Sequence, residues 1–222
     1  MKTKILTLVA ATCLMAASVR ATTMTFVTPV GATLNALPVE AQATFVTGAD
    51  LLQITILNTI FNPTSVIQNV SGLGFTLSSG QTSGVLANSS GLFRTVNSNK
   101  TFTDGAVGPT DWTLTDLFLN ALGGGPDQTI IGDPDGSKYT NAKGSIAGNG
   151  PHNPFLYGKV TFWVTIDGLT ADDSVTSADF AFGTDLTRLP PPPSVPDGGA
   201  TAVLLGLGLV SMSFIARRRL VA

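Results

Sequence analysis

The chain has 222 residues, and its 12 Lys and Arg against 14 Asp and Glu give a formal net charge of −2. Half of the basic residues lie near the two ends, so residues 22–194 carry six basic and thirteen acidic side chains, a net charge of −7. Such an acidic domain argues against nucleic acid or anionic lipid as a partner. Because the only cysteine is Cys13, residues 22–222 can form no disulfide, zinc–thiolate site or cysteine-bound iron–sulfur cluster.

The first 21 residues have the three parts of a secretory signal peptide. Lys2 and Lys4 form a basic start, and residues 5–17 form an apolar run. The small residues Val19 and Ala21 then occupy the positions that a signal peptidase reads, which predicts cleavage after Ala21. We therefore expect a signal helix within residues 1–21 and an exported domain at residues 22–188.

The composition of this domain predicts an all-β fold. It is rich in Thr, Val, Ile, Phe, Gly, Asn and Ser, which favour strands and turns. Residues 43–47, a turn at 48–50 and residues 51–58 form the pattern of a β-hairpin, and the clearest single strand is 159–166, with alternating apolar residues. Many short strands separated by turns indicate an antiparallel β-sandwich of the immunoglobulin-like or jelly-roll type.

Further short segments share β-branched or aromatic residues between turn signals. They lie at 74–77, 85–88, 92–96, 112–114 and 175–182. A helical segment is expected only at 117–122, and a turn at 63–68.

One segment has the beginning of a calcium-binding loop. Asp133 and Asp135 are two residues apart and are followed by Gly136. Carboxylate oxygens converging through a sharp turn are typical calcium ligands, which makes these two aspartates candidate ligands. The twelfth position of the loop is Gly144 rather than an acidic residue, so Asp127 or Asn141 would have to contribute. The alternative is an ordinary turn, which Asp-Pro-Asp-Gly also favours.

Other residues with catalytic or binding chemistry give weaker patterns. His152, the only histidine, lies between two prolines, where it would serve either as a general base or as a local backbone cap. A glycosidase needs two paired carboxylates, and the spacing of the many aspartates and the lone Glu40 selects no pair. Four aromatic side chains could stack on sugar rings or pack in the core: Trp112, Tyr139, Tyr157 and Trp163.

The C-terminal region has three parts in a fixed order after a proline-rich linker at 189–194. A polar motif reads Val195, Pro196, Asp197, Gly198 and Gly199, an uncharged apolar run covers residues 200–216, and three arginines follow at Arg217, Arg218 and Arg219. Seventeen apolar residues are at the short end of the ~17–25 that cross a bilayer as a helix. The arginines are expected to stop the helix on the cytoplasmic side.

This arrangement resembles the PEP-CTERM class of bacterial protein-sorting signals, and most closely the type whose motif is VPDSG or VPDGG. The resemblance implies recognition by an exosortase, a membrane transpeptidase-like enzyme that would cut near residues 195–199 and remove the helix. Residues 54–80, 150–166 and 178–185 also resemble segments of uncharacterised secreted PEP-CTERM proteins, which implies a β-rich domain of unknown activity. A membrane anchor that is never cut is the alternative.

Together these features predict a non-enzymatic protein that is exported and held at the membrane as a precursor. Its mature form is expected at the cell surface or in the extracellular matrix, in a structural or adhesive role. The expected partners are the export machinery, an exosortase, the membrane and an exopolysaccharide, and no cofactor is required. A calcium-assisted carbohydrate-binding module is the alternative, and a secreted hydrolase is a weaker one.

Overall fold

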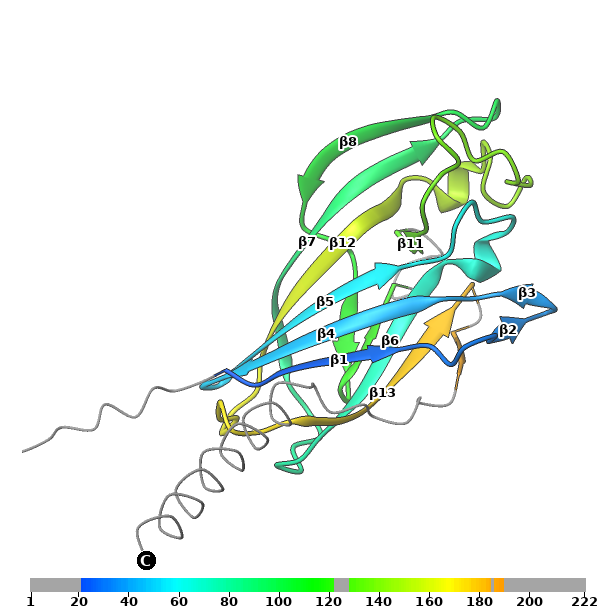
Figure 1. Cartoon of the computed structure of the whole chain (residues 1–222). Coiled ribbons are helices and arrows are strands. Elements are labelled where there is room, and N and C mark those ends of the chain that lie inside the picture. The colour runs from blue at the N-terminus through cyan, green and yellow to red at the C-terminus, as the bar shows by residue number, and fades with distance from the viewer. Residues whose placement is uncertain (1–20, 122–127, 185, 190–222) are drawn as a thin grey trace, which may run out of the picture.

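The computed structural model describes residues 21–121, 128–184 and 186–189, and strands dominate this part of the chain (Figure 1). The helical elements within these residues are two short 3-10 helices, η1 (Val66–Gln68) and η2 (Gly150–His152). The strands, in chain order, are β1 (Thr23–Val27), β2 (Thr33–Leu34), β3 (Leu37–Pro38), β4 (Ala41–Gly48), β5 (Leu51–Asn58), β6 (Val70–Leu77), β7 (Val85–Val96), β8 (Phe102–Gly108), β9 (Thr113–Thr115), β10 (Phe118–Asn120), β11 (Ile130–Ile131), β12 (Phe155–Thr165), β13 (Val175–Phe182) and β14 (Thr187–Arg188). The predicted all-β fold is therefore confirmed.

The hairpin of β4 and β5 follows directly from its sequence pattern. Alternate residues of both strands are buried, among them Leu52, Ile54 and Ile56, each at 0% exposure. Because side chains alternate across a strand, this places one apolar face on the core and leaves a polar face outside. Asp50 closes the turn with a φ of 54°, and its carboxylate accepts a hydrogen bond from the backbone N–H of Gly168 at 2.8 Å.

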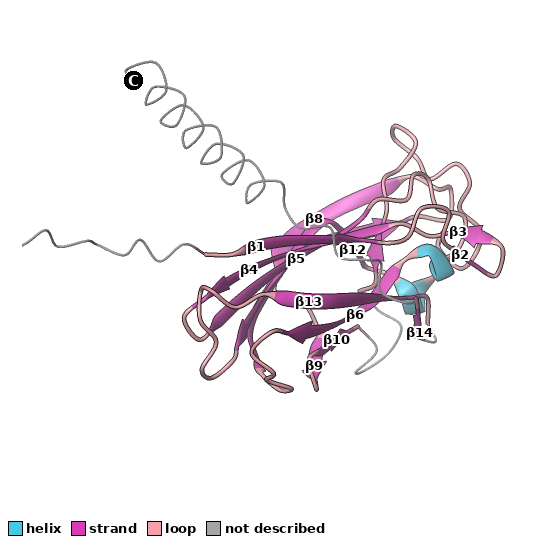
Figure 2. Cartoon of the chain, turned by 60° about the horizontal axis from the view of Figure 1, so that its bottom comes forward, coloured by secondary structure: helices cyan, strands magenta, loops and turns pink. Residues whose placement is uncertain are grey.

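The strands form two layers, visible in Figure 2 as an upper and a lower group. The first has the order β1-β4-β5-β12-β7-β8, and the second contains β13, β6, β10 and β9, with β14 beside β13. Strand β11 joins the layers, since it pairs antiparallel with β6 and parallel with β12. All of these strands thus belong to one mixed 12-stranded sheet, which corrects the expectation of purely antiparallel pairing.

The apolar core lies between the two layers. The ring of Phe45 on β4 contacts Phe26 on β1 and Phe75 on β6, with ring centroids 5.7 and 5.6 Å apart. Trp112 packs on Phe162 of β12 at 5.0 Å. A second buried cluster is formed by residues of η1, β7, β11, β12 and the segment after β11, among them Ile131, Tyr139 and Phe155. Burial of apolar area at both places is the main force that holds the layers together.

Several predicted elements change in extent, and one changes in type. The segments at 85–88 and 92–96 are a single strand, β7, and the segments at 74–77 and 159–166 belong to the longer strands β6 and β12. The segment expected to be helical at 117–122 instead contains β10, which pairs with β6 and β9. Asp116 and Leu117 form the turn before β10 with positive φ, which no right-handed helix allows.

No helix in the described residues is long and apolar enough to cross a membrane. Residues 1–20 of the predicted signal segment 1–21, the motif at 195–199, the apolar run at 200–216 and the arginines at 217–219 all lie outside the described residues.

Candidate functional site

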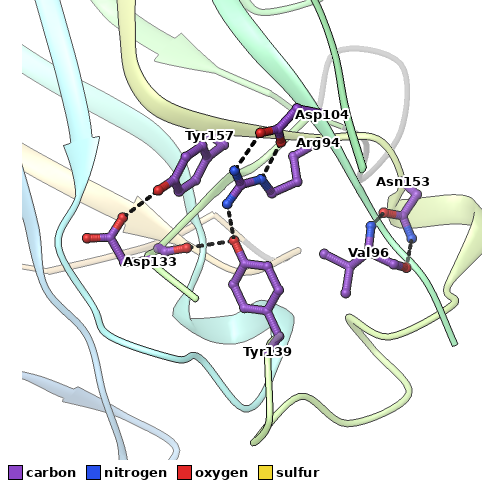
Figure 3. A network of polar contacts seen from close by, with 8 residues as sticks. Arg94, Val96, Asp104, Asp133, Tyr139, Asn153 and Tyr157 are labelled. Carbon is purple, nitrogen blue, oxygen red and sulfur yellow. Dashed lines mark hydrogen bonds and ion pairs between the residues drawn. The ribbon is translucent and has the colours of Figure 1, made fainter. Parts of the chain in front are cut away.

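A polar cluster of charged and aromatic side chains surrounds Arg94, near the C-terminal end of β7 (Figure 3). The register of β7 and β8 places Asp104 directly opposite Arg94. The guanidinium therefore donates two parallel hydrogen bonds to the carboxylate, from Nε to Oδ1 at 2.6 Å and from Nη2 to Oδ2 at 2.8 Å. The Arg94 side chain is only 4% exposed, whereas the Asp104 side chain is 39% exposed. A buried charge is thus neutralised by a partner at the surface.

Aromatic rings complete the surroundings of the guanidinium. Its central carbon lies 3.8 Å from the ring centroid of Phe102 and 3.3 Å from that of Tyr157. Cation–π contacts of this kind are worth up to about 2 kcal/mol when water is excluded. Because Phe102 is on β8 and Tyr157 is on β12, the stacked rings attach the outer β7–β8 hairpin to the rest of the sheet.

Two tyrosine hydroxyls extend the cluster into the segment after β11. The hydroxyl of Tyr139 accepts a hydrogen bond from Arg94 Nη1 at 3.2 Å and donates one to the carbonyl of Gly132 at 2.9 Å. The hydroxyl of Tyr157 donates to Oδ1 of Asp133 at 3.0 Å. The cluster therefore ties β7, β8 and β12 to the segment 132–140, and its charged and hydroxyl groups are satisfied by one another.

Burial raises the pKa of Tyr139 above its usual range and outweighs the opposing effect of its hydrogen bond with Arg94. Burial also raises the pKa of Tyr157, assisted by its hydrogen bond to Asp133. For Arg94, burial acts to lower the pKa, but the hydrogen bonds to Asp104 and Tyr139 prevail and keep it charged.

We expect these shifts to make the fold sensitive to alkali. Below about pH 10 both tyrosines are protonated whether the chain is folded or unfolded, and their full contribution to stability is present. Above pH 10 the unfolded chain ionises first, so the free energy of unfolding falls by up to about 1.4 kcal/mol per pH unit for Tyr139, until the pH passes its folded pKa. Urea unfolding between pH 9 and 11 measures this slope. If the free energy of unfolding of Tyr139→Phe fell as steeply with pH as that of the unaltered protein, Tyr139 would not be the source of the slope. Tyr157→Phe should reduce the slope by less, because Tyr157 is less buried.

Each of the two predicted calcium ligands accepts a hydrogen bond from a protein hydroxyl. Oδ1 of Asp133 accepts the hydrogen bond from the hydroxyl of Tyr157, and Oδ2 of Asp135 accepts one from the hydroxyl of Thr140 at 3.2 Å. The backbones of Asp135 and Lys138 exchange two hydrogen bonds across a turn in which Gly136 has a φ of 60°. In residues 21–121, 128–184 and 186–189, no group of three or more His, Cys, Asp or Glu side chains could hold a metal ion. Asp127 is outside these ranges.

His152 and Asn153 act on nearby backbone. The Nδ1 atom of His152 lies 2.7 Å from the carbonyl oxygen of Ser145, as expected of a local cap. The amide of Asn153 accepts a hydrogen bond from Val96 N at 2.8 Å and donates to Val96 O at 3.3 Å (Figure 3), so it continues the hydrogen bonding of β7 where that strand ends. Sequence reasoning missed this role of Asn153, which only the folded chain brings next to Val96.

The aromatic residues considered for sugar stacking do not share one exposed face. Trp112 is 3% exposed and donates from its indole nitrogen to the carbonyl of Gln128 at 2.9 Å, and Tyr139 is fully buried. Trp163 is half-buried on the other face of β12 from the core residue Phe162. Packing is thus the role of Trp112 and Tyr139.

The cluster around Arg94 joins three strands to the segment after β11, and its guanidinium, its two tyrosine hydroxyls and the Asp104 carboxylate all have protein partners. Sequence reasoning did not identify Arg94 or Asp104, and the available signal was their placement on two strands that could pair as a hairpin. Comparisons of the chain with known protein families, with curated proteins and with solved structures found no match.

Proposed function

We propose that the chain is an exported surface or matrix protein with a structural or adhesive role, sorted through its C-terminal segment and processed there by an exosortase. The observation that carries this proposal is the order of the VPDGG motif at 195–199, the apolar run at 200–216 and the arginines at 217–219. An uncharged run followed by arginines suits transient residence in a bilayer with the preceding domain outside.

The exported domain supports a structural role. We propose that its two layers are those of a β-sandwich of the immunoglobulin-like or jelly-roll type. Its most elaborate polar cluster, around Arg94, joins strands rather than presenting reactive groups. A domain of this kind suits mechanical or adhesive work, with an exopolysaccharide or another surface component as the partner and without a cofactor.

The test is intact-mass and C-terminal peptide analysis of the protein from surface and membrane fractions of a host with a working sorting enzyme. We expect the mature chain to end within or near Val195–Gly199. Replacing Pro196 and Asp197 by alanine should instead leave the peptide 217–222 attached. Replacing Pro191 and Pro192 of the linker by alanine is the control, and it should not prevent removal of that peptide. Retention of that peptide at full stoichiometry in the unaltered protein would show a permanent anchor.

A further inference from the structure

The connection from β6 to β7 lies between two hollows of the surface, near the lower end of the molecule in Figure 1. One has a volume of about 550 Å³ and is bordered by β6 and the turn at Asp116 and Leu117. The other, of about 400 Å³, is bordered by the end of β12 and Asp167. Residues 80–82 line both hollows, which we together call the loop groove. Its size is within the range of small-molecule sites.

The larger hollow has an apolar floor. Phe75, Leu77 and Leu117 line it, and these side chains are 5%, 7% and 3% exposed, so each shows the hollow only a small part of its surface. An apolar group placed there would lose contact with water without displacing any core residue. The floor thus selects a ligand with an apolar body.

Three acceptor groups of the loop groove have no hydrogen-bond partner in the described part of the chain: the side-chain oxygen of Gln81 and the carboxylates of Asp116 and Asp167. Oε1 of Gln81 is buried and has no hydrogen-bond partner, while Nε2 of the same amide donates to the carbonyl of Asp167 at 3.4 Å. Within the described part of the chain, no donor or cation reaches the carboxylate of Asp116 or Asp167. The described residues that line the groove include no Lys, Arg or His. A positively charged donor on a ligand would therefore complement these acceptors.

The backbone holds Asp116 at the rim in an unusual conformation. Asp116 and Leu117 have φ angles of 47° and 55°, a left-handed conformation that costs a residue with a side chain roughly 1–2 kcal/mol. The turn is fixed by the hydrogen bond from the N–H of Phe75 to the carbonyl of Leu117 at 3.2 Å. Asp116 is exposed and Leu117 is buried, so this turn lends the larger hollow an exposed carboxylate at its edge and an apolar side chain in its floor.

We propose that the loop groove binds a cationic amine with an apolar body, which lies on Phe75, Leu77 and Leu117 and directs its ammonium group to Asp116. A longer ligand that passes Gln81 reaches Asp167 in the second hollow. This site is independent of the C-terminal sorting segment.

The test uses three small molecules of similar shape with the full chain: phenethylamine, 2-phenylethanol and 3-phenylpropionate. Titration calorimetry should show that the amine binds about tenfold more tightly than the alcohol, with the anion weakest, since a charge-assisted hydrogen bond is worth at least a factor of ten. Asp116→Asn should remove the preference for the amine. The matched control is Asp172→Asn, an exposed aspartate outside the groove.

Three outcomes would overturn the proposal. The first is equal binding of the three molecules, and the second is no binding of the amine. The third is an amine preference that persists when Asp116 and Asp167 are both asparagine, or that falls equally in Asp172→Asn, since this would reflect the net charge of the domain rather than a site. Leu117→Gly suits the positive φ at that position and should weaken the amine and the alcohol together, because it removes part of the apolar floor, and urea unfolding of the variant checks that the loss of this buried side chain leaves it folded.

Discussion

Gly132→Ala is expected to destabilise the domain by about 3 kcal/mol or more, which is a large part of the 5–15 kcal/mol that holds a typical domain folded. A Cβ atom at this position would overlap the carbonyl oxygen of Ile60 and lie 2.6 Å from its Cγ2. The backbone at Ile60 cannot simply move away, because the N–H of Asp133 donates a hydrogen bond to that same carbonyl at 3.1 Å. The carbonyl of Gly132 is also an acceptor for Tyr139 at the centre of the Arg94 cluster.

Urea unfolding followed by the fluorescence of the buried Trp112 measures this effect. The matched control is Gly144→Ala, where an added Cβ meets no atom within 4 Å and the φ is not positive. The midpoint of Gly144→Ala should stay within the range of a surface change, about 0.5 kcal/mol, or rise slightly because alanine restricts the unfolded chain. Equal midpoints for the two variants would mean that the chain at Ile60 yields more easily than its hydrogen bonds suggest.

The parts of the fold that could be predicted from sequence are those whose pattern is local. The β4–β5 hairpin and β13 lie within a few residues of their predicted ranges, because the alternation of apolar and polar residues reports which face is buried. The same local reasoning failed at residues 117–122. The backbone turns at Asp116 and Leu117, and the buried Leu117 and Leu119 belong to this turn and to β10.

The candidate sites depend on register and on distant pairings that a single sequence does not reveal. Arg94 and Tyr139 are 45 residues apart, and Tyr157 reaches Asp133 across 24 residues. Asp133 was predicted as a candidate calcium ligand, and its carboxylate accepts a hydrogen bond from a tyrosine hydroxyl that the sequence could not place beside it. The short strand β11 is similar: its two isoleucines give no periodic signal, yet β11 joins the two layers.

Arg94→Ala is expected to cost about 3 kcal/mol, the lower end of the range for breaking a buried ion pair. The exposure of Asp104 sets this lower value, because water can solvate the carboxylate after the arginine is gone. The lost stacking on Phe102 and Tyr157 and the lost hydrogen bond to Tyr139 add to the cost. Arg94→Lys should recover only part of it, because an ammonium group cannot form the two parallel bonds.

Asp104→Ala removes the carboxylate of the ion pair but keeps the arginine side chain and its stacking on the aromatic rings. It leaves the guanidinium buried without its carboxylate, so it should cost about as much as Arg94→Ala, although Asp104 itself is more exposed. The double variant should then cost much less than the sum of the two, which a double-mutant cycle of urea midpoints measures. Arg188→Ala is the control, since this arginine is 52% exposed and lies 3.4 Å from Asp179, a surface pair expected to be worth less than about 1 kcal/mol. Additive costs for Arg94 and Asp104 would show that the side chains stabilise the domain separately, through the aromatic rings and not through their ion pair.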